Sequence, residues 1–323
     1  MSKDNRPSYG GQAVIEGVMM RGPRHMVLSV RDPDGKVVSL SRTPESLAQR
    51  SKLARLPVIR GAVSLWESLS LGIQMLMKSA EIASPEEEQP SESALSLAVL
   101  FAIVVGLGVF VLLPAYVTPW IMKSLSVSGR YWAGFIETGF RLMLLVGYVV
   151  SISRMEDIQR VLEYHGAEHK VIWAYENNTV SVEQFLGNID TCGSQGGFQG
   201  GSRDAVEFLV EKAVPETTLH PRCGTSFLFI AVIVTWVVFL FVSPQGFVAR
   251  VAARLAMLPV IAGIAHEVLK NSSRREGLFW NLVKAPGIAM QKLTTREPDK
   301  SQLEVAATSL VLLMCAESNT GRA

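Results

Sequence analysis

The distribution of hydrophobic residues along the chain predicts several membrane-spanning helices. Residues 94–122 include no charged residue, and this run is longer than the roughly 20 apolar residues that a helix needs to cross a bilayer. Further apolar runs cover residues 131–152, 225–242 and 247–268. We therefore expect about four transmembrane helices. A re-entrant segment is the alternative for the last run, because its first turns carry two arginines.

The N-terminal part of the chain shows other periodicities. Residues 10–42 contain β-rich runs, and the sequence Asp-Pro-Asp-Gly at 32–35 separates two of them, which predicts a hairpin turn. From residue 59 to residue 82, apolar residues recur at helical spacing among polar ones. This pattern predicts an amphipathic helix, of the kind that lies on a membrane surface.

Together these patterns predict a mainly α-helical, polytopic membrane protein with a small N-terminal β unit and cytoplasmic helices. The expected organisation is an N-terminal β-containing segment (1–58), an amphipathic helix with an acidic linker (59–93), a first transmembrane helix pair (94–152), a segment with a candidate metal site (153–223), a second transmembrane pair (224–270) and a tail with an interfacial helix (271–323). Lysine and arginine concentrate in the fourth and last of these segments. The positive-inside rule then places both segments and both termini in the cytoplasm.

Composition narrows the function classes. Of the 323 residues, 48% are hydrophobic and 19% are charged, below the charged share of about a quarter in soluble domains. The net charge of +2 gives no electrostatic footprint for nucleic acid. The predicted partners are the lipid bilayer, from the apolar runs, and an unidentified substrate. The three cysteines include no CxxC pair, which excludes a zinc ribbon. Oligomeric state and substrate are left open.

The clearest chemical signal is the HxxEH pattern formed by residues 165–169. A helix places positions i and i+4 on one face, so His165 and His169 can bind one metal ion. Glu168 lies beside them, and the equivalent glutamate of inverted zinc-peptidase motifs is a general base that acts on metal-bound water. The alternative is a solvated polar helix face. Only five histidines occur in the chain, however, and three of them fall between residues 165 and 223.

A second cluster, at residues 220–225, strengthens the metal hypothesis. His220 and Cys223 are residue types that bind zinc, and they stand three positions apart just before the third apolar run. We expect His220 as the third ligand and Cys223 as the next candidate, with a small buried cysteine as its alternative. Arg222 is a candidate for stabilising developing negative charge, or a positive-inside anchor. Glu267 is a candidate carboxylate ligand, or a residue that orients a ligating histidine.

Three other charged residues are candidates outside these clusters. Glu16 lies among apolar residues with glycines on both sides, which is typical of a loop that approaches another part of the chain closely; an ordinary surface charge is the alternative. Glu137 and Arg141 fall within the second apolar run. They stand four residues apart with the acid first, the favourable order for an ion pair on a helix. Such residues face protein or a water-filled cavity rather than lipid.

Four segments carry a family resemblance: GGQAVIEGVMMRGP (10–23), YHGAEHK (164–170), HPRCGTSFLF (220–229) and LTTREPD (293–299). They resemble the YqhQ-like family of bacterial membrane proteins, whose members are described as predicted metal-dependent enzymes. The resemblance implies a multi-pass protein of the bacterial inner membrane, but it implies no substrate. One departure is the longer link between the second and third segments. Residues 187–218 add a glycine-rich stretch and a predicted helix from about residue 203 to 213.

Two functional hypotheses follow. The first is a hydrolase at the cytoplasmic membrane face, which binds a divalent metal, with zinc favoured over iron or manganese. In this hypothesis His165, His169 and His220 hold the metal and Glu168 is the general base. The second is a non-catalytic scaffold or a transporter in which the metal only joins two helices. Glu137 and Arg141 would then be the central functional residues.

Overall fold

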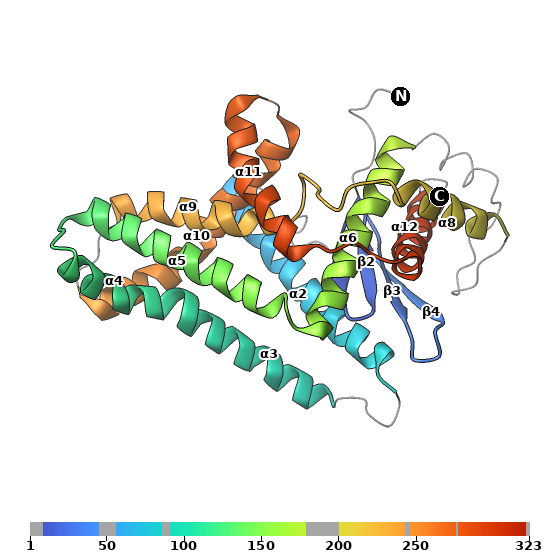
Figure 1. The fold of residues 1–323 in the computed structure, drawn as a ribbon, viewed down its shortest axis with the longest axis horizontal. Helices are drawn as coiled ribbons and strands as arrows, with labels where there is room; N and C mark the ends of the chain where they lie inside the picture. The colour runs from blue at the N-terminus through green and yellow to red at the C-terminus, as the bar shows by residue number, and fades with distance from the viewer. Residues whose placement is uncertain are drawn as a thin grey trace.

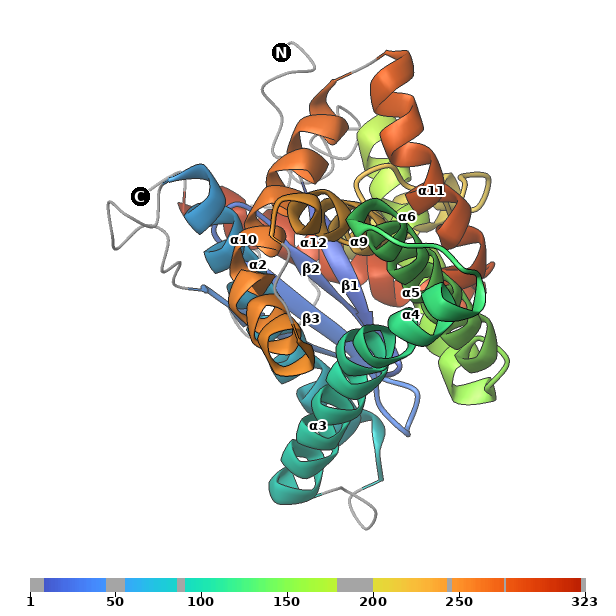
Figure 2. The same cartoon turned by 90° about the vertical axis from the view of Figure 1, so that its left-hand side faces the viewer.

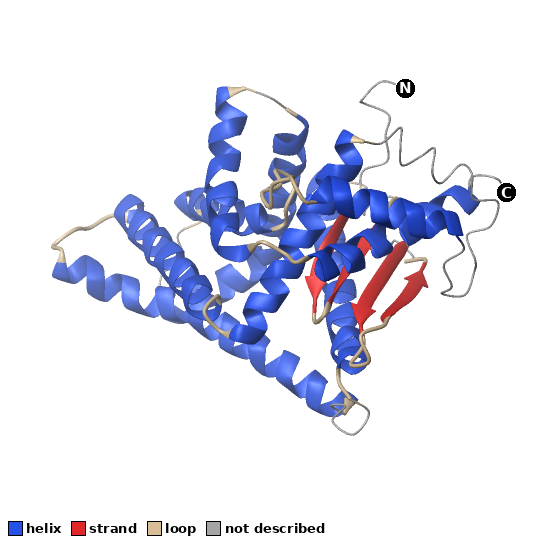
Figure 3. Cartoon of the chain, turned by 45° about the vertical axis from the view of Figure 1, so that its right-hand side comes forward, coloured by secondary structure: helices blue, strands red, loops and turns tan. Residues whose placement is uncertain are grey.

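The computed structural model describes residues 9–44, 56–85, 91–178, 200–242, 246–275 and 277–320. These residues are mainly helical and include one small sheet (Figures 1 and 3). In Figure 1 the sheet lies on the right and a set of long helices extends to the left. The glycine-rich stretch expected before residue 200 lies outside the described residues, whereas the helix expected after it is present as α8 (Gly200–Ala213).

The β unit expected near the N-terminus is confirmed as an antiparallel meander. Its strands, in the order in which they pair, are β1 (Gly10–Val14), β2 (Gly17–Arg21), β3 (Met26–Arg31) and β4 (Val37–Arg42). The turn at residues 32–35 joins the last two strands, with Gly35 at a φ of +81°. Ile15 and Glu16 form the loop between the first two, and Glu16 has a φ of +49°. A positive φ is uncommon for a residue with a side chain.

The alternation of side chains in the strands buries both faces of the sheet. Val18, Met20 and Val27 pack with α6 (Glu156–Asn177) and α12 (Lys300–Thr320). The residues that point the other way in β2 and β3, such as Met19 and Leu28, pack against α2 (Pro57–Ala83). Because successive residues of a strand point to opposite faces, a central strand that lies between helices is apolar throughout. The amphipathic helix expected at residues 59–82 is therefore present and covers one face of the sheet.

The remaining helices form two hairpins and a connecting helix. They are α3 (Glu92–Leu107), which continues through a π-helical turn η4 (Gly108–Leu112) into α4 (Leu113–Ser124), then α5 (Arg130–Ile152), α9 (Thr225–Phe241), α10 (Phe247–Arg274) and α11 (Leu278–Thr294). Helix α5 contacts α4 and α9, and α10 contacts α9, α4 and α2. Helices α4 and α9 end, and α5 and α10 begin, at the end of the molecule remote from the sheet, the end that Figure 2 presents to the viewer.

Three helical segments are long and apolar enough to cross a membrane: Ser93–Ser124, Arg130–Ile152 and Phe247–Ser272. None of the most apolar stretch of the first is buried, and side chains such as Leu97 and Phe101 are exposed along it. An apolar surface of this extent marks a contact with lipid or with another protein. The third expected span, at residues 225–242, is not among them: it is present as the apolar helix Thr225–Phe241, which is only 17 residues long.

Candidate metal centre

Helix α6 positions the HxxEH residues in the interior of the part of the molecule formed by the sheet, α6, α8 and α12, which we call the sheet end. His169 is 1% exposed and Glu168 is 5% exposed, although both side chains are polar. Their helix packs against β1, β2, α8 and α12. Because a buried polar group costs free energy unless it is paired, the partners of these side chains decide what the site can do.

Each of the two histidines donates a hydrogen bond from Nδ1 to a main-chain carbonyl. His165 Nδ1 lies 2.7 Å from the carbonyl oxygen of Thr294, and His169 Nδ1 lies 2.5 Å from that of Thr218. A carbonyl oxygen only accepts, so the geometry assigns the proton of each neutral ring to Nδ1 and leaves a lone pair on Nε2. This arrangement orients the histidines of metal sites, where the second ring nitrogen is held by an outer partner.

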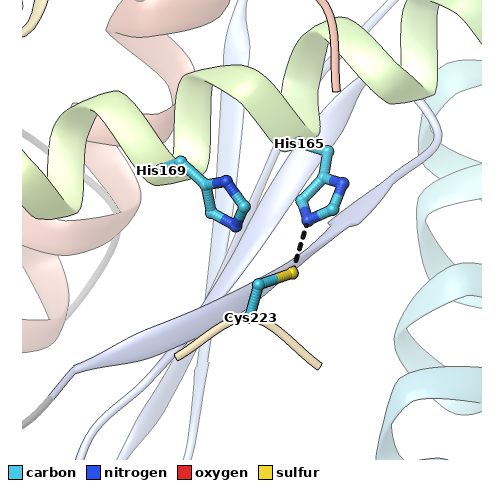
Figure 4. Close-up of side chains that lie close together, drawn as sticks. All are labelled: His165, His169 and Cys223. Carbon is cyan, nitrogen blue, oxygen red and sulfur yellow. Dashed lines mark hydrogen bonds between the residues drawn. The ribbon is translucent and has the colours of Figure 1, made fainter. Parts of the chain in front are cut away.

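The Nε2 atoms of the two rings face the thiol of Cys223 (Figure 4). His165 Nε2 is 3.2 Å from Cys223 Sγ, and one ligand atom each from His165, His169 and Cys223 lie within 4.8 Å of one another (Figure 4). We call these three residues the His–His–Cys group. His169 Nε2 is buried and has no hydrogen-bond partner among the described residues. Two imidazole nitrogens and a thiolate are a donor set that zinc favours, and an orphaned buried nitrogen is accounted for by a metal at this point.

Glu168 lies next to the group and is held by the opposite side of the site. Its Oε1 accepts a hydrogen bond of 2.9 Å from the backbone N–H of Gly11 in β1. A Cβ on Gly11 would stand 2.6 Å from the carbonyl oxygen of Met19, so only glycine allows the strand to approach in this way. Burial raises the pKa of the Glu168 carboxyl, and the charges of His165 and His220 oppose that shift. Burial conversely lowers the pKa of His169, which favours the neutral ring.

The segment that carries Cys223 is held along its length by α6 and α11. Trp173 Nε1 donates to the carbonyl oxygen of Leu219 at 2.9 Å. The buried side chain of Gln291 makes two hydrogen bonds to the main chain of His220, accepting from its N–H at 2.7 Å and donating to its carbonyl oxygen at 2.9 Å. These bonds fix the backbone three residues before the thiol.

A second close approach fixes the position of the Thr294 carbonyl. A Cβ on Gly166 would overlap the carbonyl oxygen of Arg296, so the chain after α11 lies directly against α6 at this glycine. The Arg296 N–H also donates to the carbonyl oxygen of Leu162 at 3.0 Å. Gly166 is thus required in the middle of the motif for a packing reason, while its neighbour His165 takes the carbonyl of Thr294.

The structure places Cys223, and not His220, in the group with His165 and His169. The ring of His220 is 5.6 Å from that of His169, centre to centre, but His220 does not belong to the His–His–Cys group. Its Nδ1 accepts a long hydrogen bond of 3.4 Å from the Arg222 N–H. Burial lowers the pKa of His220 to about 4. Cys223, the second candidate from the sequence, lies with the two histidines because the turn after His220 points the thiol back toward α6 (Figure 4).

Several other candidates lie elsewhere. Glu267 forms an ion pair of 2.7 Å with Arg60 of α2 and does not join the group. Glu16 pairs with Arg160 at 2.5 Å on the outer side of α6, so in the glycine-rich N-terminal segment it is the backbone of Gly11 that approaches the site. The ion pair expected between Glu137 and Arg141 is present at 2.7 Å, at the hairpin end of the molecule.

A cavity of about 570 Å³ opens in front of the group. Its lining includes His165, Glu168, His169, His220 and Cys223. Arg222 also lines it and forms an ion pair with Glu176. Segments 9–13, 161–172 and 220–225 therefore converge on one cavity, as in pockets where a small number of polar groups meet within an apolar wall.

Gly11, Thr218, Gln291 and Thr294 are four of the partners in this site that the sequence analysis did not identify. Three of the four act through the main chain, and a carbonyl or an amide leaves no residue-type signal. The glycine pair at residues 10–11 was the one available signal, because two glycines before a β-rich run indicate a close backbone approach.

The architecture defines a mainly helical protein in which a four-stranded sheet and α6 carry a buried His–His–Cys group, and in which three helices have the length and hydropathy of membrane spans. The chain belongs to the family described as "Protein of unknown function (DUF1385)", which matches residues 56–191 and 203–315. It is similar to the protein called "Uncharacterized protein YqhQ" of Bacillus subtilis (strain 168), with 32% identity over 327 residues that cover 97% of this chain and 94% of that one. Membership of the YqhQ-like family is thus confirmed, whereas the membrane location and the metal-dependent activity that the resemblance implies stay predictions. No solved structure matches the chain.

Proposed function

We propose that this protein is a metal-dependent hydrolase whose centre is the His–His–Cys group, with zinc as the metal. The observation that supports the proposal most strongly is the pair of Nδ1–carbonyl hydrogen bonds at His165 and His169. They leave both Nε2 atoms as lone-pair donors, and one ligand atom each from His165, His169 and Cys223 lie within 4.8 Å of one another. Three protein ligands leave one position of a tetrahedral zinc site open, as catalytic zinc sites do.

In this proposal Glu168 and Arg222 have separate roles beside the bound metal. Zinc, when bound, supplies a Lewis acid that lowers the pKa of a water molecule toward about 7. Glu168 accepts the proton of the attacking water, because its carboxylate faces the same cavity and has one oxygen held by Gly11. Arg222 stands on the cavity wall beside Glu176, where its guanidinium can stabilise negative charge that develops on the substrate.

A non-catalytic scaffold or transporter remains the second candidate. The observation in its favour is the ion-pair network of Glu137, Arg141 and Arg254, which lies between apolar helices far from the metal centre. In that case the metal would join α6 to the segment before α9 and carry no reaction.

Substitution of Glu168 separates the two candidates. If the protein is a hydrolase, Glu168→Gln retains bound metal. It does not return a strain that lacks the protein to wild-type behaviour, because the amide cannot accept a proton. His169→Ala should lose the metal and should also fail to complement the strain. His25 lies outside the cavity, so His25→Ala should keep the metal and complement the strain. Restoration of the phenotype by Glu168→Gln would overturn the hydrolase and favour a structural metal.

We also propose four membrane spans, with Thr225–Phe241 as the short one, and a cytoplasmic location for both termini and the sheet end. The proposal is supported by the excess of lysine and arginine in residues 153–223 and in the tail. An even number of spans would place both chain ends on the same side. A membrane-impermeant thiol reagent should not label a cysteine introduced at residue 154 in intact cells. Labelling at that position would show that the orientation is reversed.

A further inference from the structure

The end of the molecule remote from the sheet contains a second cavity, of about 340 Å³. It lies where the two helical hairpins meet, and residues of α4, α5, α9 and α10 line it. Its charged lining residues are Arg130, Glu137, Arg250 and Arg254. Three arginines stand against one glutamate, so the described part of the lining has a net formal charge of +2. We call this space the arginine cavity.

Arg254 is the central residue of the arginine cavity. Its side chain is 8% exposed and forms an ion pair with Glu137 through Nη2. Its Nε and Nη1 atoms are buried and have no hydrogen-bond partner among the described residues. A buried guanidinium with two unsatisfied donors is costly, and an acceptor that enters the cavity would satisfy them.

Glu137 does not balance the positive charge around it. The same carboxylate pairs with Arg141 at 2.7 Å through one oxygen and with Arg254 through the other. Arg141 is itself largely buried, and its Nε also has no hydrogen-bond partner among the described residues. One carboxylate therefore serves two buried guanidinium groups. Arg250 and Arg130, at the rim of the cavity, have no acidic partner among the described lining residues.

We propose that the arginine cavity binds an anion that bears a phosphate group. The arginine fork presents donors in a plane that match phosphate oxygens two at a time, and several such forks converge here. A phosphate offers several acceptor oxygens and negative charge, which the net positive lining lacks. A cation would meet the opposite balance of charge, and an apolar ligand would leave the buried Arg254 donors unsatisfied.

The phosphate has two chemical sources that the same arginines would accept. One is the headgroup of an anionic phospholipid, since the cavity lies at the hairpin end of apolar helices and its walls include Ala133, Phe239 and Val242, which can contact hydrocarbon. The other is a free phosphate or a soluble phosphate ester. Neither source depends on the metal centre, which lies at the other end of the molecule (Figure 1).

The test uses the full chain purified in a phosphate-free zwitterionic detergent. Sodium phosphate is titrated calorimetrically against sodium chloride at equal ionic strength. The unfolding temperature is then compared in micelles doped with phosphatidylglycerol or with phosphatidylcholine. We expect Arg250→Gln and Arg130→Gln each to weaken binding at least about tenfold, which corresponds to about one lost charge-assisted hydrogen bond. Arg154→Gln, an exposed arginine outside the cavity, serves as the matched control and should bind as the wild type does.

Binding of inorganic phosphate without preference for phosphatidylglycerol assigns the site to a soluble ligand, and stabilisation by phosphatidylglycerol that Arg250→Gln abolishes assigns it to a lipid headgroup. If neither probe binds the wild type, or if Arg250→Gln and Arg154→Gln respond alike, the proposal is overturned. Arg254→Lys, which keeps the charge and loses the planar fork, should weaken binding while the protein stays folded.

Discussion

The two ends of the molecule hold buried polar groups by different means. At the sheet end, main-chain atoms of distant segments fix the side chains: the carbonyls of Thr218 and Thr294 hold the imidazoles, and the N–H of Gly11 holds Glu168. At the hairpin end, side chains hold one another, as Glu137 does for Arg141 and Arg254. Main-chain partners leave the ring nitrogens and the carboxylate available for chemistry. Mutual ion pairs use the charged groups themselves, and only the surplus arginine donors remain.

The largest effect is expected on the unfolding free energy, when the ion pairs at the hairpin end are broken. Glu137→Gln removes the one carboxylate that serves two buried arginines, and loss of a partner in a buried pair typically costs about 3–5 kcal/mol. Arg141→Gln should cost less, because Glu137 keeps Arg254. Unfolding in detergent followed by circular dichroism measures the difference. Equal effects of the two substitutions would mean that the network does not centre on Glu137. The metal content should not change in either variant.

A smaller effect is expected at the sheet end from a residue that binds nothing itself. Gly166→Ala places a methyl group against the Arg296 carbonyl and displaces the chain that offers the Thr294 oxygen to His165. Loss of such an outer partner typically lowers metal affinity about 10–100-fold. Competition with a chromophoric chelator measures this affinity. Gly106→Ala is the matched control, because nothing lies within 4 Å of a Cβ at that helical glycine. Equal affinity in both variants would show that the Thr294 carbonyl has no part in the site.

The smallest effect is a loss of unfolding free energy at acidic pH, which we expect to arise at the sheet end. Burial lowers the pKa of His220 from its usual 6.5 to about 4. Between pH 6.5 and pH 4, His220 is therefore protonated in the unfolded chain but neutral in the folded chain. Stability is therefore fully present above pH 6.5 and falls as the pH is lowered toward 4, by about 2 kcal/mol at pH 5. Chelator-treated His220→Gln should show a flatter decline in unfolding free energy than chelator-treated wild type. Parallel declines would place the acid sensitivity elsewhere.

Local signals in the sequence predicted much of the fold. The hairpin turn at residues 32–35, the amphipathic helix α2, the helix that carries HxxEH and the pair Glu137–Arg141 all depend on residues close in sequence, where periodicity and i,i+4 spacing apply. For residues 10–31 the sequence predicted a β unit but not the four-stranded meander. The turn between the first two strands, Ile15 and Glu16, contains no glycine and so gives no hairpin signal.

The site was predictable only in part. The HxxEH residues could be identified because helical spacing alone places them together. The sequence favoured His220 over Cys223, but which of the two lies with His165 and His169 depends on how Gln291 and Trp173 fix the chain between Leu219 and Cys223. The pairing of Glu267 with Arg60 likewise depends on the packing of α10 against α2, which residue types do not specify.

The measurement that tests the central claim most directly is the metal content of the purified protein and two of its variants. We predict about one zinc ion per chain in wild type purified without added metal, which is the stoichiometry of a single three-ligand site. Cys223→Ala should lose that zinc, whereas His220→Ala should retain it at a reduced level. Elemental analysis by plasma mass spectrometry, with folding checked by circular dichroism, gives these values. A folded wild type without stoichiometric metal, or a Cys223→Ala variant that retains zinc while His220→Ala loses it, would contradict the assignment of the His–His–Cys group as the metal centre.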